Sequence, residues 1–376
     1  MDGLFDFLDE VRLENICDLP QGYDDLQIGK RIHLLHADDA DWDDADMILL
    51  GCGSFDDPEE EWQVSCDSVR RALYKMYDWH PGIKVADLGN IRKGAHPSDT
   101  RAALRTVLKE TETAGKIVVL LGGTHDQMMQ QYDVFEQTGK VIEAAVLDRF
   151  INLEDSEGLN GRNFLMSMLT RQPNFLRHFS VLGFQSYDVH PNVLETLDKL
   201  RFDCVRLGVL RENLDEWEPT LRHCELLAVD MQVLRYAEAM FLQDASPNGL
   251  FGDELCQLLR YAGMSSRLSS LGIYGYRAQT DTHGKGAQLV AQMLWYFVDG
   301  LRLRGQEADL RDADNFFSYH VSISGVETLF VKSKRTGRWW MQMPDLSFVP
   351  CSYRDYLTAG NNDIPERWLR AQERTV

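Results

Sequence analysis

The sequence Ala145-Val146-Leu147-Asp148-Arg149-Phe150-Ile151-Asn152 closes a short apolar run with a carboxylate. Two other stretches have the same form, Leu121-Gly122-Gly123-Thr124-His125-Asp126 and Ala228-Val229-Asp230-Met231-Gln232-Val233-Leu234-Arg235. Short, continuous apolar runs are typical of strands that a parallel sheet buries on both faces. In open α/β sheets, ligands bind where such strands end. We therefore expect the functional site of this chain at these three strand ends.

Eight apolar runs predict the strands of one sheet, at residues 47–52, 83–88, 117–121, 142–147, 180–184, 204–209, 226–230 and 271–276. Amphipathic patterns between them predict helices at residues 62–77, 99–113, 191–200, 253–262 and 285–303. Repeated strand–helix units connect through right-handed crossovers. The predicted fold class is therefore α/β, a three-layer α/β/α sandwich with an eight-stranded, mainly parallel, doubly wound sheet.

The pattern changes near the C-terminus, but no linker interrupts the chain. We expect a single domain over residues 1–376, with an N-terminal extension at 1–44 and a C-terminal elaboration at 312–376. Residues 334–337, Lys-Arg-Thr-Gly, are predicted to turn a β-hairpin between residues 329–333 and 338–343. Trp339 and Trp340 would then expose one ring on each face. A short helix is predicted after Asp363.

Composition excludes several classes of partner. Apolar residues make up 44% of the 376 residues, which is enough for a large core, and the formal net charge is -20. That charge repels nucleic acid and anionic membrane surfaces, so neither is an expected partner. No run of about 18 uncharged apolar residues is present, and no membrane span is expected. The seven cysteines form no Cys-x-x-Cys pair, which favours a reducing compartment and a cytoplasmic location.

The three strand ends resemble the ureohydrolase superfamily, which includes arginase, agmatinase and formimidoylglutamase. That family's motifs read Gly-Gly-Asp/Ser-His-Ser/Asp, then D-A-H-x-D, then S-x-D-x-D-x-x-D-P. The resemblance covers most of residues 45–300, and Arg338-Trp339-Trp340 is similar to a stretch in bacterial formimidoylglutamase-like chains. It implies an arginase-like fold with an eight-stranded sheet, two Mn²⁺ ions, and hydrolysis of a formimidoyl or guanidino group.

Residue by residue, the resemblance keeps three metal ligands. His125 matches the first metal histidine of the family, and Asp148 and Asp230 match the two aspartates that bridge its metals. The other ligand positions carry residues that the family does not use there, namely Phe150 for the second histidine and Asn152, Gln232 and Arg235 for aspartates. Near the family's substrate-side histidine and glutamate stand Asn160 and, in a looser alignment, Gly275.

Charge decides how many ions this set can hold. Two divalent ions about 3.5–4 Å apart bring four positive charges, and only two of the family's four aspartates remain. We therefore expect no two-metal site. A single divalent ion, Mn²⁺ in the family, has the ligands His125, Asp148 and Asp230, with the Asn152 carbonyl as a weak fourth. Otherwise the two aspartates are satisfied by Arg149, Arg235 or backbone N–H groups, and no cofactor is bound.

Two hypotheses follow. The favoured one is a ureohydrolase-fold pseudoenzyme with a vestigial metal site and no catalytic residue, which works as a binding or structural partner. It would bind a protein or further copies of itself through Trp339-Trp340 or the acidic stretches 38–46 and 56–61. A small ligand in the cleft is the other partner we expect, with its carboxylate on Arg235 or Arg277. The alternative is a hydrolase of formimidoyl- or guanidino-substituted amino acids or amines that uses a residual metal.

Overall fold

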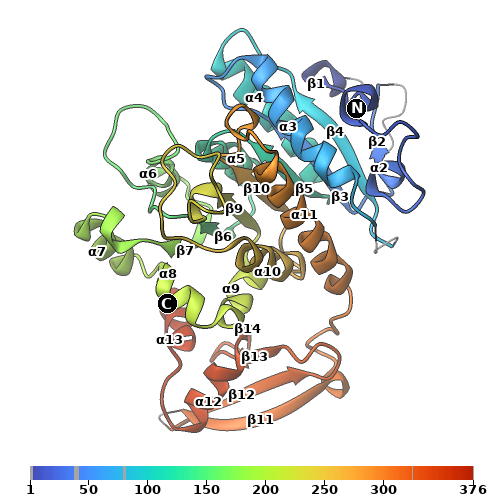
Figure 1. Cartoon of the computed structure of the whole chain (residues 1–376). Coiled ribbons are helices and arrows are strands. Elements are labelled where there is room, and N and C mark those ends of the chain that lie inside the picture. The colour runs from blue at the N-terminus through green and yellow to red at the C-terminus, as the bar shows by residue number, and fades with distance from the viewer. Residues whose placement is uncertain (1–2, 38–41, 79–81, 324, 376) are drawn as a thin grey trace.

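A computed structural model describes residues 3–37, 42–78, 82–323 and 325–375. Its main sheet has ten strands in the order β1-β4-β3-β5-β10-β9-β6-β7-β8, with β2 beside β4 (Figure 1). The eight predicted strands are present as β3 Met47–Cys52, β4 Val85–Ile91, β5 Ile117–Gly122, β6 Ile142–Leu147, β7 Leu176–Phe184, β8 Asp203–Arg206, β9 Leu226–Asp230 and β10 Ser270–Tyr274. All pair in parallel, whereas the short β1 (Leu8–Asp9) runs antiparallel to β4 and β2 (His33–Leu34) parallel to it.

One predicted strand is too long. The apolar run 204–209 leaves the sheet at Arg206, and Leu207 opens the helix α8 (Leu207–Glu212). Leu207 and Leu210 are both buried, three residues apart, as one face of a helix requires. A short apolar run alone does not distinguish the two structures.

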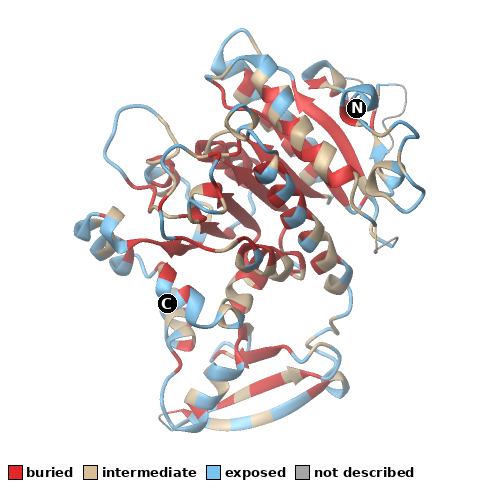
Figure 2. Ribbon diagram, in the orientation of Figure 1, coloured by how far each residue is buried: buried red, intermediate tan, exposed pale blue. Residues whose placement is uncertain are grey.

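Alternate residues of each strand point to opposite faces of the sheet and pack into two separate cores, one on each face. Leu49, Val119 and Val229 belong to the first core, and Ile48 and Leu120 belong to the second. The first is covered by α3 (Glu59–Tyr74), α10 (Gly252–Gly263) and α11 (Lys285–Arg304), and the second by α4 (Pro97–Thr113), α5 (Met128–Thr138) and α6 (Phe164–Thr170). Figure 2 shows the resulting buried sheet between partly exposed helices. The predicted three-layer α/β/α class is confirmed.

The other helices before residue 316 are short. They are α1 Leu13–Ile16, α2 Ile28–Arg31, α7 Pro191–Lys199, α9 Glu218–His223, and the 3-10 turns η1 Phe5–Phe7, η2 His125–Gln127, η3 Ser186–Asp188, η4 Leu214–Trp217, η5 Met231–Val233, η6 Ala278–Thr280 and η7 Ala313–Asn315. No helix in the described part of the chain has the length and apolar character that a bilayer crossing needs.

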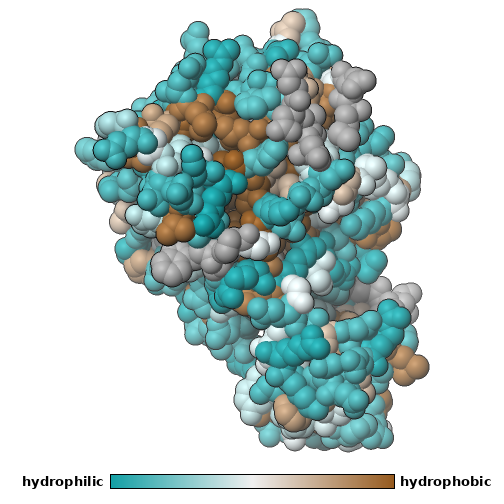
Figure 3. Space-filling view, turned by 90° about the vertical axis from the view of Figure 1, so that its right-hand side faces the viewer, coloured by the Kyte–Doolittle hydropathy of each residue, from teal (hydrophilic) through white to brown (hydrophobic). Residues whose placement is uncertain are grey.

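The C-terminal residues build more than the predicted hairpin. They form a separate antiparallel sheet in the order β11-β12-β13-β14, with strands β11 Phe316–Ile323, β12 Val326–Ser333, β13 Trp339–Gln342 and β14 Phe348–Cys351. The helices α12 (Tyr353–Gly360) and α13 (Glu366–Thr375) accompany it. In Figure 3 this part forms the smaller lobe below the body.

Trp339 and Trp340 do point to opposite faces of this sheet, but neither ring is exposed. Trp339 is 7% exposed and packs against Tyr319 and Tyr356, and Trp340 is 6% exposed and packs against Phe316. The expectation of two exposed rings was therefore wrong. Strand and helix partners cover both faces, so the tryptophans are core residues.

Candidate functional site

Three strands bring the three predicted ligands together. His125 follows β5 in the turn η2, Asp148 follows β6, and Asp230 ends β9. Because β10 pairs with β5 on one side and with β9 on the other, and β9 pairs with β6, these carboxyl ends lie along one edge of the sheet. All three side chains are buried.

His125 lies at the centre of the cluster. Its Nδ1 is 2.9 Å from Asp148 Oδ2 and 3.6 Å from Asp230 Oδ2. One ligand atom from each of the three residues lies within 4.8 Å of the others, a spacing that a single ion can bridge. No other trio of His, Cys, Asp or Glu side chains in the described residues is placed in this way.

The Asn152 side chain directs a hydrogen-bond donor into the cluster. Its Nδ2 donates to Asp148 Oδ2 at 2.8 Å and lies 3.1 Å from His125 Nδ1. Within the described chain, Asn152 Oδ1 and His125 Nε2 are buried without a hydrogen-bond partner. The amide therefore presents N–H, not oxygen, to the carboxylate that would bind a cation.

Backbone groups satisfy the two aspartates further. The Phe150 N–H donates to Asp148 Oδ1 at 3.1 Å, and the Gln232 N–H donates to Asp230 Oδ1 at 2.8 Å. This part of the expected network is confirmed.

The expected arginines, in contrast, belong to other ion pairs. Arg149 binds Asp188 at 2.6 Å, and Arg235 binds Glu238 at 2.8 Å. Of the alternatives expected for satisfying the aspartates, the backbone N–H groups are found, and these two arginines form their ion pairs with other carboxylates. Each guanidinium finds a carboxylate on its own or a neighbouring loop, which sequence order alone did not reveal.

The position of the family's second histidine is apolar and covered by a cation. The Arg162 guanidinium carbon lies 3.1 Å from the centre of the Phe150 ring, and that of Arg149 lies 4.8 Å from it. Arg162 also forms an ion pair with Glu154 at 2.7 Å. A second divalent ion at this position would meet an aromatic ring and two positive charges.

Two aromatic rings that sequence reasoning missed enclose His125. Tyr274 stacks on the imidazole with 5.3 Å between ring centroids, and Phe164 lies at 4.6 Å. Tyr274 ends β10 directly opposite Asp230, so its position follows from strand register. No signal in the sequence indicated Phe164.

Burial controls the protonation of the cluster. Burial, together with the Asp148 carboxylate, raises the pKa of Asp230 to about 7. Burial alone would lower the pKa of His125, but the hydrogen bond to Asp148 and the two carboxylate charges outweigh it and raise that pKa. The folded cluster therefore retains protons that an exposed aspartate and histidine would release.

The two residues near the family's substrate positions have structural surroundings. Asn160 accepts a hydrogen bond from the Arg162 N–H at 2.8 Å and donates to Ser156 Oγ at 3.1 Å. Gly275 has φ +86°, and a Cβ there would lie 3.2 Å from Asp230 Oδ1. A side chain at residue 275 would therefore be strained and would crowd Asp230.

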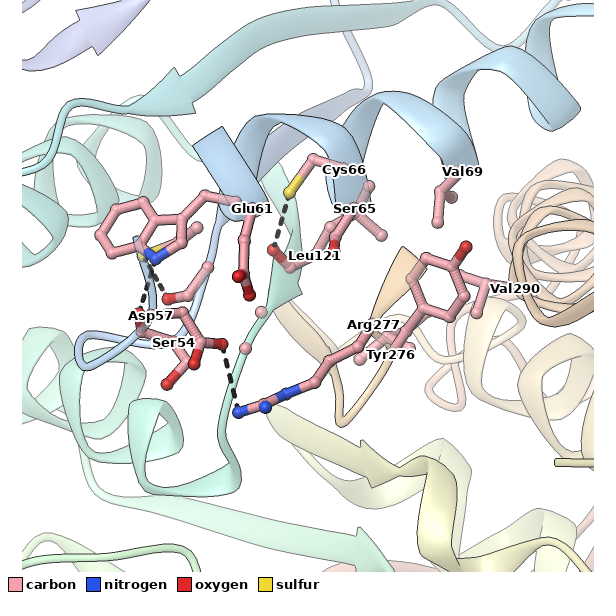
Figure 4. A pocket seen from close by; sticks show the side chains of 16 residues that line it. Ser54, Asp57, Glu61, Ser65, Cys66, Val69, Leu121, Tyr276, Arg277 and Val290 are labelled. Carbon is pink, nitrogen blue, oxygen red and sulfur yellow. Dashed lines mark hydrogen bonds and ion pairs between the residues drawn. The ribbon is translucent and has the colours of Figure 1, made fainter. Parts of the chain in front are cut away.

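A pocket that is open to solvent lies at the carboxyl ends of β3, β5 and β10. Its rim carries Asp57, Glu61 and Arg277, and Val69 and Val290 belong to its apolar wall (Figure 4). Arg277 Nη2 lies 3.1 Å from Asp57 Oδ2, and the Arg277 side chain is 51% exposed. Figure 4 shows Glu61 and Arg277 directed into the space between α3 and the sheet.

This pocket lies where the strand order reverses. The chain passes from β3 outward to β4 and then returns to β5 on the other side of β3. Loops that diverge from two neighbouring strands leave a crevice, which is the usual ligand position in doubly wound sheets.

Several solved structures have the same architecture as this chain. A formimidoylglutamase from Bacillus subtilis superposes with a TM-score of 0.64 at 17% identity, over 76% of this chain and 96% of that one. A formiminoglutamase from Trypanosoma cruzi solved with Mn²⁺ superposes with a TM-score of 0.61 at 12% identity, over 79% of this chain and 100% of that one. An agmatine ureohydrolase of Thermoplasma volcanium superposes with a TM-score of 0.58 at 17% identity, over 79% of this chain and 99% of that one.

The chain has the arginase-superfamily fold. No family model and no curated protein matches its sequence. The arginase-superfamily structures are covered almost completely, whereas between a fifth and a quarter of this chain lies outside each of these three superpositions.

The residues present do not fit the two-ion centre that this fold family implies. Phe150 offers no ligand atom, Asn152 directs its N–H groups inward, and Arg235 is held by Glu238. The remaining donors, His125, Asp148 and Asp230, fit one ion at most.

Proposed function

We propose that this chain is an arginase-fold pseudoenzyme that acts as a binding partner in the cytoplasm, with a vestigial metal site. One observation carries the proposal: Asn152 donates into Asp148 at 2.8 Å in a buried cluster with only two carboxylates. This hydrogen bond uses the carboxylate oxygen that an ion would need. In support of the reducing compartment, all seven cysteines are free thiols.

Calorimetric titration with Mn²⁺ tests the proposal. We expect the natural chain to bind fewer than two ions and to release neither urea nor formamide from guanidino or formimidoyl substrates. The variant Phe150→His/Asn152→Asp/Gln232→Asp restores a histidine and two carboxylates, and it should bind two ions. Two ions in the natural chain, together with product release at an ordinary turnover rate, would refute the proposal.

A single-ion hydrolase is the second candidate, because the ligand atoms of His125, Asp148 and Asp230 lie within 4.8 Å of one another. When bound, such an ion would supply an activated water. Under this alternative, Mn²⁺ raises the thermal midpoint of the natural chain, and Asp148→Ala abolishes the rise. Hydrolysis that depends on the same aspartate would favour the enzyme, whereas an unchanged midpoint favours the pseudoenzyme.

We propose the pocket at the β3–β5 reversal as the small-ligand site of this binding protein. Both arginines expected to recognise a carboxylate have an acidic partner, but Arg277 and its partner Asp57 line the pocket, whereas Arg235 does not line it and pairs with Glu238. Isothermal titration with small carboxylates such as glutamate should show binding that Arg277→Met weakens at least tenfold. The matched control Arg235→Met should leave affinity unchanged, and equal losses in both variants would contradict the assignment.

The two surfaces expected for protein partners differ in their support. The Trp339-Trp340 pair is buried and offers no contact surface. Within the acidic stretches, residues 38–41 lie outside the described residues, and Asp56, Glu59 and Glu60 are exposed. Residues 59–61 form the first turn of α3, so this acidic stretch is only partly a loop. A basic partner on residues 56–61 stays a proposal, which charge reversal there would test by loss of binding.

A further inference from the structure

The strand β11 is an open edge of the C-terminal sheet. All eight of its residues pair with β12 on one side, and no strand in the described part of the chain pairs along its other side. Figure 1 shows β11 as the outermost element at the lower end of the molecule. An edge of this length exposes a row of backbone donors and acceptors to which another strand can bind.

The hydrogen-bond register shows which groups face outward. The Lys334 N–H donates to the Asn315 carbonyl at 2.9 Å, just before β11 begins. Antiparallel ladders alternate, so every second residue directs its N–H and C=O away from the partner strand. Counting from Asn315, these are the even-numbered residues, and Ser318, His320 and Ser322 among them are exposed.

The opposite edge of the same sheet is shorter than β11 and contains a proline. The edge strand β14 has only four residues and includes Pro350, and a helix contacts each edge strand, α9 on β14 and α12 on β11. In contrast, β11 reads Phe-Phe-Ser-Tyr-His-Val-Ser-Ile, without proline, aspartate, glutamate, lysine or arginine. Natural sheets usually shield exposed edges with such residues, so an uncharged eight-residue edge indicates that something pairs with it.

Charge distribution points to a second copy of this chain as the occupant. Residues 312–376 contain eight lysines and arginines and eight aspartates and glutamates, so the whole net charge of -20 lies in residues 1–311. A basic partner would be drawn to the acidic body. Two copies, in contrast, approach with least repulsion through their neutral sheets. No lysine, arginine, aspartate or glutamate of β11 would meet a like charge in another β11, and His320 of β11 lies 3.1 Å from Glu327 of β12.

We propose that β11 is a dimerisation edge, where the β11 strands of two copies pair antiparallel and join two four-stranded sheets into one of eight strands. Main-chain hydrogen bonds from the outward groups of Ser318, His320 and Ser322 supply the pairing. Phe317, which is 51% exposed on β11, lies at the same edge and loses exposed surface on association. The site is independent of the metal cluster and of the pocket.

Sedimentation equilibrium of the full chain tests this proposal. We expect twice the mass of one chain at micromolar concentration. The variant Ser318→Lys/Ser322→Lys places like charges opposite each other in the paired strands, and we expect it to sediment as a monomer with at least a hundredfold weaker association. The control Ser318→Ala/Ser322→Ala keeps the backbone and adds no charge, and it should remain a dimer.

Hydrogen exchange gives a second readout that does not depend on the substitutions. The amides of residues 318, 320 and 322 should exchange at least tenfold more slowly in the natural chain than in the lysine variant, while the amides of β12 stay equally protected in both. A monomeric natural chain, or an oligomer whose mass the lysines leave unchanged, overturns the proposal. Circular dichroism of both variants confirms that a lower mass does not come from unfolding.

Discussion

At the scale of single residues, the hydrogen bond from Asn152 to Asp148 is the main feature of the candidate site. An aspartate at this position would add a negative charge to the cluster, whereas the amide donates to Asp148 Oδ2 at 2.8 Å. Burial and the Asp148 carboxylate raise the pKa of Asp230 in the same buried space. The proposal of a vestigial metal site rests on these side chains.

The protonation of Asp230 predicts a pH dependence of stability. Its pKa is raised in the folded chain, so between about pH 4 and 7 the unfolded chain releases a proton that the folded chain keeps, and stability falls as pH rises. The raised pKa of His125 acts in the same direction, since its stabilisation is lost above the ordinary histidine range. In Asp230→Asn the loss of unfolding free energy from pH 4.5 to 7.5 should be smaller by about 2 kcal/mol.

Urea titrations at both pH values, in the presence of a chelator, measure this difference. The exposed Asp244→Asn should follow the natural chain. An Asp230→Asn variant that loses stability in parallel with the natural chain would show that Asp230 is ionised throughout.

At the scale of elements, buried ion pairs fix how helices attach to the sheet. Arg70 on α3 is fully buried and binds both oxygens of Asp87 on β4, at 2.8 and 2.9 Å. Its Nη2 also donates to the Gly89 carbonyl, and Tyr74 donates to the same aspartate at 2.7 Å. This network positions α3, which forms one wall of the pocket at the β3–β5 reversal.

Arg70→Met should therefore destabilise the fold strongly. It leaves the Asp87 carboxylate buried without its cation, which costs about 3–5 kcal/mol. The neighbouring Arg71 donates to the Asn15 carbonyl at an exposed position, so Arg71→Met should cost less than about 1 kcal/mol. Equal denaturation midpoints for the two variants would be inconsistent with a structural role for the Arg70–Asp87 pair.

Arg367 attaches the C-terminal helix α13 in a similar way. It binds Asp355 on α12 at 3.1 Å and donates to Thr220 Oγ1 at 3.0 Å and to the Glu216 carbonyl at 2.8 Å. Arg367→Met should speed amide exchange in α13 at least tenfold, which corresponds to about 1.4 kcal/mol of local stability. The exposed Arg354→Met is the control, and unchanged exchange in the Arg367 variant would contradict this attachment.

At the scale of the whole molecule, charge and shape are divided between two parts. The acidic body contains the arginase-superfamily fold, the cluster and the pocket, and the neutral C-terminal sheet lies outside it as a smaller lobe (Figure 3). Because repulsion between two bodies opposes pairing of their sheets, association should depend on ionic strength.

Dimerisation should therefore strengthen with salt. The screening length falls from about 10 Å at 0.1 M to about 3 Å at 1 M, and we expect the dimer dissociation constant to fall at least threefold over this range. Sedimentation at several salt concentrations measures the change, with the lysine variant of β11 expected to stay monomeric throughout. A dissociation constant that rises with salt would indicate an interface held by opposite charges.

Much of this protein follows from local sequence. Continuous apolar runs predicted eight strands, because residues buried on both faces of a sheet must be apolar. The resemblance to the ureohydrolase motifs implied that His125, Asp148 and Asp230 lie together. Side-chain partners could not be predicted in the same way. Arg149 and Arg235 stand beside the aspartates in sequence, yet they bind Asp188 and Glu238, because loop paths decide which carboxylate a long side chain reaches.

The layered fold and the absence of several ligand types can be inferred from residue identity at spaced positions. The folded chain was needed to show that Asn152 directs an N–H into the cluster, that Phe164 and Tyr274 enclose His125, and that both tryptophans are buried. These features depend on contacts between segments far apart in the chain. Their distances are set by packing of the whole core, which no local pattern encodes.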